Sequence, residues 1–235
     1  MREKVVGILG GMGPESTADF FLRVIKATPA KRDQEHLRII VDNNPKIPDR
    51  TLALLTEDGS ILEDLRGTLR NLVKAGAEII AMPCNTAHHY YDELQSSIDI
   101  PIVNMISETA KYIESEFPSI KKIGLLATTG TIETGIYHKA IKKEIGVIMP
   151  DEDGQKGVMS VIYGEWGIKA GYTYGDTRRE MQEVAETLVK RGAEAIIMGC
   201  TEISLVLKQE NISVPLIDPL QILAEVIVKK ARQME

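Results

Sequence analysis

The sequence predicts an α/β fold of two pseudo-symmetric lobes, each a parallel sheet flanked by helices. Two observations support it: short β-branched runs alternate with longer segments of helical period, and one half of the chain repeats the other. Strands that are apolar throughout, rather than at every second residue, are buried on both faces. The 235 residues are enough for two small α/β domains.

The expected elements follow one another in a βαβα order. A helix is predicted where apolar residues recur at helical spacing over residues 61–73, and another over residues 181–188, with Asp176 or Thr177 as the N-cap. Five buried strands are predicted, at residues 5–9, 38–41, 78–82, 122–126 and 194–198.

The internal repeat defines the expected lobes. Residues 76–84 match residues 192–200 at six of nine positions, and the offset of 116 residues is too long for a solenoid repeat. We therefore expect an N-terminal lobe at 1–104 and a C-terminal lobe at 105–217. A C-terminal helix at 218–235 is expected to pack back onto the first lobe.

Composition excludes several classes of function. The chain has 28 basic and 34 acidic side chains and a net charge of −6, which predicts neither a nucleic-acid nor an anionic-membrane partner. No apolar run approaches the roughly 18 residues of a membrane span. Two cysteines are too few for a secreted disulfide framework, so we expect a cytoplasmic protein.

The two cysteines, Cys84 and Cys200, lie at matching points of the repeat, each directly after a predicted strand. Ligands of open α/β sheets bind at this carboxyl edge, and a following helix directs its positive dipole end there. The sequence therefore predicts thiols of lowered pKa. Polar residues follow each cysteine: Asn85 and Thr86 in the first half, Thr201 and Glu202 in the second.

A pair of thiols facing one cleft between the lobes suits the inversion of a carbon stereocentre. One face needs a base to remove the proton, and the opposite face needs an acid to return it. Three other interpretations remain open: buried packing cysteines, a redox sensor joining Cys84 to Cys200, and a non-catalytic protein that binds a small carboxylate. Recurrence of a cysteine in both halves favours catalysis.

Several motifs together resemble the aspartate racemase branch of the aspartate/glutamate (hydantoin) racemase superfamily, along essentially the whole chain. The resemblance implies a cofactor-independent racemase with catalytic Cys84 and Cys200, in a homodimer whose subunits each have two flavodoxin-like lobes. The motifs are Gly-Gly-Met-Gly-Pro at 10–14, Ile-Pro-Asp-Arg-Thr at 47–51, Met-Pro-Cys-Asn-Thr-Ala-His at 82–88, Ile-Tyr at 162–163 with Lys169 and Gly171, and Gly-Cys-Thr-Glu at 199–202.

The resemblance also implies substrate contacts. A basic pair, Arg50 and Lys169, would hold the side-chain carboxylate of the substrate. The glutamate racemase branch has a histidine where this chain has Glu202, and Glu202 is a candidate for binding the substrate ammonium group. The candidate substrate-binding residues are Met12, Arg50, Asn85, Thr86, Thr128, Lys169, Thr201 and Glu202.

Alternatives within the superfamily stay open. They are a racemase of another or broader amino acid range, including glutamate, and a related isomerase or decarboxylase. The substrate in each case is a small molecule, and no cofactor is expected.

Two further patterns could suggest other ligands. The glycines at 10–13 lack the spacing of a nucleotide site, so we expect their N–H groups to approach a small anion such as an α-carboxylate. The adjacent His88 and His89 point to different sides of a helix, and no metal site is predicted.

Overall fold

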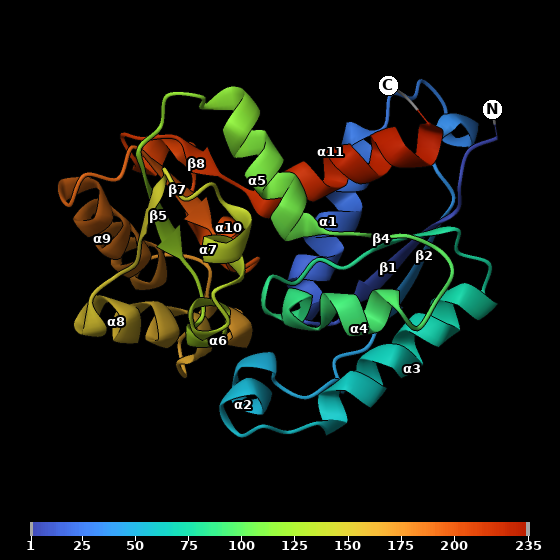
Figure 1. The fold of residues 1–235 in the computed structure, drawn as a ribbon, viewed down its shortest axis with the longest axis horizontal. Helices are drawn as coiled ribbons and strands as arrows, with labels where there is room; N and C mark the ends of the chain where they lie inside the picture. Colours follow the sequence, from blue (N-terminus) through green and yellow to red (C-terminus); the bar gives the residue numbers. More distant parts are fainter. Residues whose placement is uncertain (1, 234–235) are drawn as a thin grey trace. The chain divides into compact units, whose positions relative to one another are not determined.

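The computed structural model describes residues 2–233, which form two compact units: residues 2–108 with 220–233, and residues 109–219. Each unit contains its own four-stranded sheet, and every strand pair is parallel. The strand orders are β2-β1-β3-β4 and β6-β5-β7-β8, which are the same order repeated. The predicted α/β fold with two similar parallel sheets is confirmed (Figure 1).

The first unit starts with a strand followed by a helix, and the last helix of the chain completes it. Its elements are β1 (Val6–Gly10), α1 (Pro14–Ala27), η1 (Asp33–Glu35), β2 (Ile39–Asn43), α2 (Arg50–Leu55), α3 (Ser60–Lys74), β3 (Ile79–Ala81), η2 (Thr86–Tyr90), α4 (Tyr91–Gln95), β4 (Ile102–Val103), the start of α5 (Met105–Glu116), and α11 (Pro219–Arg232), where η denotes a 3-10 helix.

The second unit repeats this arrangement. Its elements after α5 are β5 (Lys122–Leu126), α6 (Thr129–Glu133), α7 (Ile136–Ala140), β6 (Gly146–Ile148), α8 (Glu152–Tyr163), η3 (Ile168–Ala170), α9 (Asp176–Lys190), β7 (Ala195–Met198), α10 (Ile203–Val206), η4 (Gln209–Asn211) and β8 (Leu216–Ile217).

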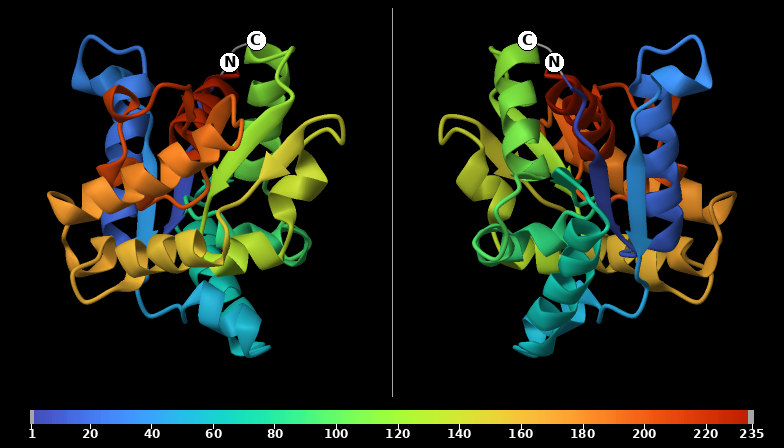
Figure 2. Two further views of the ribbon diagram at one scale, coloured as in Figure 1. Left: turned by 90° about the vertical axis from the view of Figure 1, so that its left-hand side faces the viewer. Right: turned by 90° about the vertical axis from the view of Figure 1, so that its right-hand side faces the viewer.

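Helices cover both faces of the first sheet, in which β1 and β2 run side by side (Figure 2). All five residues of β1 are buried. Val6 and Ile8 pack in one cluster with Phe20 of α1 and Leu223 of α11, whereas Leu9 packs in another with α3 and α4. The C-terminal helix thus packs onto the first unit; residues 234–235 of the expected helix lie outside the described residues.

The second sheet is buried in the same way. Leu126 of β5 and Ile196 of β7 share a cluster with the apolar sides of α8, α9 and α10. In Figure 1, α8 and α9 lie on one side of β5 and β7, and α7 lies on the other. Tyr137 of α7 is almost completely buried.

Several predictions of detail need correction. Three strands, β4, β6 and β8, were not predicted. β4 and β8 have only two residues each, and none of the three residues of β6 is fully buried, so no continuous apolar run marks them. The N-cap of α9 is Gly175, and Asp176 and Thr177 lie in its first turn. Val73, at the end of the apolar stripe of α3, is exposed.

Candidate active site

Cys84 lies in a buried turn just past the carboxyl end of β3. Its carbonyl oxygen is 2.8 Å from Nδ1 of His88, and the backbone N–H of Met105 donates to Nε2 of the same ring over 3.0 Å. An N–H group can only donate, so Nε2 accepts and Nδ1 carries the ring proton. His88 therefore ties the Cys84 turn to the first residue of α5.

Burial lowers the pKa of His88 to about 4, because the charged ring is desolvated. The ring is neutral at neutral pH and holds both hydrogen bonds in a single tautomer. Sequence reasoning considered this residue only as a metal ligand. Its spacing of four residues from Cys84 was the available signal for a structural role.

Asn85 and Thr86 follow Cys84 and are buried with it. They begin the 3-10 helix η2, in which Asn85 is the N-cap residue. The structure therefore brings Cys84, Asn85 and Thr86 together at the edge of the first sheet, as predicted from their order in the chain.

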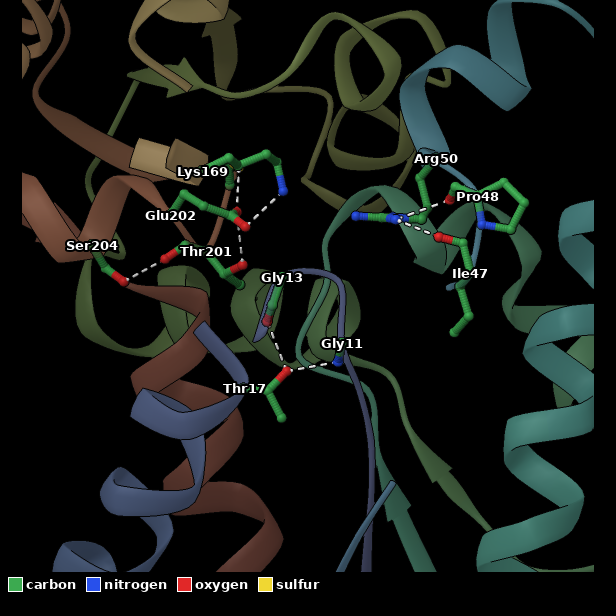
Figure 3. Close-up of polar contacts among 11 residues, drawn as sticks. Gly11, Gly13, Thr17, Ile47, Pro48, Arg50, Lys169, Thr201, Glu202 and Ser204 are labelled. Atoms are coloured by element: carbon green, nitrogen blue, oxygen red, sulfur yellow. Dashed lines mark hydrogen bonds and ion pairs between the residues drawn. The ribbon is translucent and has the colours of Figure 1, made fainter. Parts of the chain in front are cut away.

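Cys200 occupies the equivalent place after β7 in the second unit, and it is also buried. Its Sγ donates to Oε2 of Glu202 over 3.0 Å, and the hydroxyl of Thr201 lies 3.2 Å from the same oxygen. The other carboxylate oxygen of Glu202 accepts a hydrogen bond from Nζ of Lys169 over 2.9 Å (Figure 3). Four predicted site residues thus form one connected group.

The electrostatics of this group differ from the sequence expectation. Burial and the neighbouring Glu202 carboxylate raise the pKa of the Cys200 thiol well above its ordinary value. The predicted lowering of this pKa is wrong for Cys200, because α10 has only four residues and its end charge does not offset desolvation. Burial alone would raise the pKa of Glu202, but Lys169 and the hydrogen bonds outweigh it and lower that pKa.

Lys169 lies in the short helix η3 of the second unit, between glycines at 167 and 171. Besides its pairing with Glu202, its Nζ lies 5.4 Å from the ring centroid of Tyr163. A cation over an aromatic face is favourable. Tyr163 belongs to the Ile-Tyr motif, but sequence reasoning gave it no role.

Arg50 belongs to the first unit and is the first residue of α2, although the prolines at 45 and 48 before it are typical of a loop. Its side chain is buried, and the guanidinium donates to the carbonyl oxygens of Ile47 (3.3 Å) and Pro48 (2.9 Å), as Figure 3 shows. Asp49 caps the helix by accepting from the N–H of Leu52. Arg50 is therefore a fixed, desolvated cation and not a solvated surface side chain.

Met12 is buried in the turn between β1 and α1. In the same turn, Gly11 has a φ of +96°, and an added Cβ would lie 2.3 Å from the backbone carbon of Asn44. The Gly11 N–H donates to the hydroxyl of Thr17, which in turn donates to the Gly13 carbonyl (Figure 3). Gly11 thus allows the close approach of the Asn44 backbone, and its own N–H is bonded to Thr17, so it is not one of the N–H groups of the turn available to an anion.

Thr128 is the N-cap of α6 and lies at the carboxyl end of β5. Its hydroxyl accepts from the Thr131 N–H and lies 3.2 Å from the Thr131 hydroxyl. This buried side chain already has a structural role as a helix cap.

Two features are absent from the part of the chain from residue 2 to residue 233. No group of three or more His, Cys, Asp or Glu side chains there is arranged to hold a metal ion. Within the same residues, no helix combines the length and the apolar composition needed to cross a bilayer.

The neutral state of His88 predicts a specific pH dependence of stability. In the unfolded chain the ring titrates near its ordinary pKa of about 6.5, so below that pH the unfolded state binds the extra proton. Stability is therefore complete above about pH 6.5 and falls by about 3 kcal/mol as the pH drops to about 4. Urea unfolding at several pH values should show this loss.

The matched variants are His88→Asn and His89→Asn, since His89 is the exposed neighbour. His88→Asn should be less stable at pH 7 and should lack this part of the pH dependence, whereas His89→Asn should retain it. An unchanged pH profile in His88→Asn would show that the ring is not held neutral.

Comparisons with known proteins agree with the two-sheet α/β fold. Residues 9–227 match the model of the family described as Asp/Glu/Hydantoin racemase. The broad specificity amino-acid racemase RacX of Bacillus subtilis (strain 168) is 32% identical over 227 residues, which cover 94% of this chain and 95% of that protein.

Solved structures give the same result. Picrophilus torridus aspartate racemase has a TM-score of 0.83 and 30% identity, covering 97% of this chain and 94% of that one. An aspartate racemase homologue from Pyrococcus horikoshii OT3 shares the fold, with a TM-score of 0.75, 24% identity, and coverage of 98% and 99%. On its family match and its likeness to RacX along nearly the whole of both chains, the protein belongs to the Asp/Glu/Hydantoin racemase family and is a racemase.

Proposed function

We propose that the protein is a cofactor-independent amino acid racemase that acts on aspartate or a close relative, with Cys84 and Cys200 as its two proton-transfer groups. One observation carries the proposal. Each cysteine follows the third strand of its chain half, at the same position of the same strand order. Both are free thiols, and packing alone gives no reason for this repetition.

The reaction needs one proton removed and another returned. A thiolate on one face of the substrate takes the α-proton, forming an S–H bond as the C–H bond breaks. The thiol on the opposite face then gives its proton to the carbanion and becomes a thiolate. The two cysteines exchange these roles when the opposite enantiomer reacts, so no net proton is consumed.

Arg50 and Lys169 support a substrate with a side-chain carboxylate. A buried guanidinium fixed by two carbonyl oxygens is suited to paired hydrogen bonds with a carboxylate. A substrate carboxylate would share Lys169 with Glu202. The likeness to Picrophilus torridus aspartate racemase supports aspartate in particular.

A broader amino acid range is the second candidate, and the 32% identity to RacX favours it. In either case Met12, Asn85, Thr86, Thr128 and Thr201 would lie around the substrate. We further propose a homodimer in the cytoplasm, which is the arrangement that the sequence motifs imply.

Independence from cofactors is tested by removing them. Dialysis of the protein against hydroxylamine and then EDTA should leave racemisation unchanged, because thiols supply both proton transfers. Racemisation can be followed by optical rotation. Activity that disappears and returns on adding pyridoxal phosphate would contradict the two-thiol mechanism.

The two-base mechanism predicts complementary defects. Cys84→Ala and Cys200→Ala should each abolish racemisation, because one face of the carbanion then lacks a proton donor. Each variant keeps one thiol, so in D₂O one should exchange the α-proton of the L-enantiomer and the other that of the D-enantiomer. Mass spectrometry and chiral chromatography of the products separate exchange from inversion.

Each variant serves as the control for the other. If either single variant interconverts the enantiomers at a rate near that of the unmodified enzyme, another residue performs one of the transfers.

The carboxylate site is tested by comparing two substrates. Arg50→Ala should reduce kcat/KM for aspartate about ten- to a hundredfold, since a charge-assisted hydrogen bond contributes about 1.5–3 kcal/mol. It should have little effect on alanine, which has no side-chain carboxylate, if alanine is turned over. Arg50→Lys should retain only part of the kcat/KM for aspartate.

Lys46→Ala is the matched control, because Lys46 is an exposed cation of the same chain segment. An Arg50→Ala variant that folds normally and keeps its full kcat/KM for aspartate would place the carboxylate site elsewhere.

A further inference from the structure

The Cys200 turn contains a charged pair that the Cys84 turn does not repeat at the corresponding position. Two residues after Cys200 the chain has Glu202, whereas two residues after Cys84 it has the uncharged Thr86. The two halves of the chain thus present chemically different surroundings to thiols at equivalent places. A difference of this kind can give the two cysteines different protonation states in the free enzyme.

The hydrogen bonds define the protonation of the group. Oε2 of Glu202 lies within hydrogen-bonding distance of the Cys200 thiol and the Thr201 hydroxyl, and Oε1 accepts from Lys169. Lys169 donates to Oε1 and favours the charged form, and the pKa of Glu202 is lowered, so this carboxyl group is ionised. The Cys200 sulfur, 3.0 Å from an ionised carboxylate, must then carry its proton in order to make this hydrogen bond.

Burial strengthens the electrostatic interactions among these side chains. The side chain of Glu202 is 6% exposed and that of Lys169 is 25% exposed, so water screens the pair weakly. A thiolate at Cys200 would lie next to the Glu202 charge. Lys169 offsets part of that repulsion and keeps Glu202 ionised at the same time.

We propose that Glu202, held ionised by Lys169, keeps Cys200 in its thiol form and makes Cys200 the proton donor of the free enzyme. Glu202 and Lys169 are then positioning residues for this thiol. The inference rests on the proposed function, because a proton donor has meaning only if Cys200 serves the racemase reaction.

The proton balance of one turnover follows. The Cys200 S–H bond breaks as the new C–H bond forms, and Cys84 has already accepted the original α-proton. The enzyme is left with a thiolate beside Glu202. This thiolate is a strong base, which suits it to remove the α-proton of the opposite enantiomer.

Tyr137 is a further titratable group that interacts electrostatically with Cys200. Burial keeps the Tyr137 hydroxyl neutral by raising its pKa, and the charges of Asp218 and Cys200 act in the same direction. The raised pKa of Cys200 agrees with the geometry, since Glu202 raises it and Lys169 lowers it. The two charges therefore predict effects of opposite sign.

The experiment measures the thiolate of Cys200 directly. In a Cys84→Ala background Cys200 is the only thiol, and its ionisation can be followed by ultraviolet absorbance and by the rate of reaction with iodoacetamide from pH 6 to about pH 10, a range that brackets the ordinary thiol pKa. Glu202→Gln should give about tenfold more thiolate at a given pH, corresponding to about one pKa unit. Lys169→Met should give less thiolate than the background protein.

The controls distinguish charge from general disturbance. Lys156→Met removes an exposed lysine of the same unit and should leave Cys200 unchanged. In a Cys200→Ala background, Glu202→Gln should leave the titration of Cys84 unchanged. Circular dichroism verifies the fold, and if Glu202→Gln does not fold, Lys169→Met decides alone.

The inference is overturned if the folded Glu202→Gln protein keeps the Cys200 reactivity of its background, or if both variants shift it in the same direction. These measurements use no substrate. Racemisation by both cysteines without the thiolate shifts would contradict only this inference, whereas the shifts without racemisation would contradict only the proposed function.

Discussion

The two parallel sheets, whose central strands are buried on both faces, are the constraint on which the rest of the molecule depends. Parallel strands end together at one edge, and side chains just past that edge are carried by short turns. Cys84 and Cys200 each occupy the turn after the third strand of a half. The backbone hydrogen bonds between parallel strands therefore fix the position of each cysteine turn. The helices packed on the sheets exclude water from the central strands.

Buried polar groups near the thiols are satisfied in two different ways. His88 is neutral and connects two backbone segments. Because the buried ring does not accept a proton at mildly acidic pH, it lowers the stability of the fold there. Glu202 is charged and needs Lys169, because an unpaired buried carboxylate would be strongly destabilising. One half thus stabilises its cysteine turn with a neutral ring, and the other with a pair of charges. This difference gives a symmetric fold a chemically asymmetric pair of thiols.

Much of the fold followed from local patterns. The strands β1, β2, β3, β5 and β7 and the helices around Leu65 and Leu188 were predictable, because burial on one or two faces imposes a pattern on the sequence. The strands β4, β6 and β8 carry no such pattern, because β4 and β8 have two residues each and no residue of β6 is fully buried. The thiol of Cys200 was placed correctly but its pKa shift was predicted with the wrong sign. The sequence rule assumed a full helix after the strand, and the structure has a single turn.

The sequence by itself determined the α/β class, the repeat, and the position of one cysteine at the same point in each half, since these depend on residues close together in the chain. Only the tertiary structure decided which groups surround the thiols. Lys169 and Glu202 are 33 residues apart, and His88 is 17 residues from Met105. Such contacts depend on how separate turns converge at the edge of a sheet, and hydrophobic periodicity carries no information about the direction of a polar side chain there.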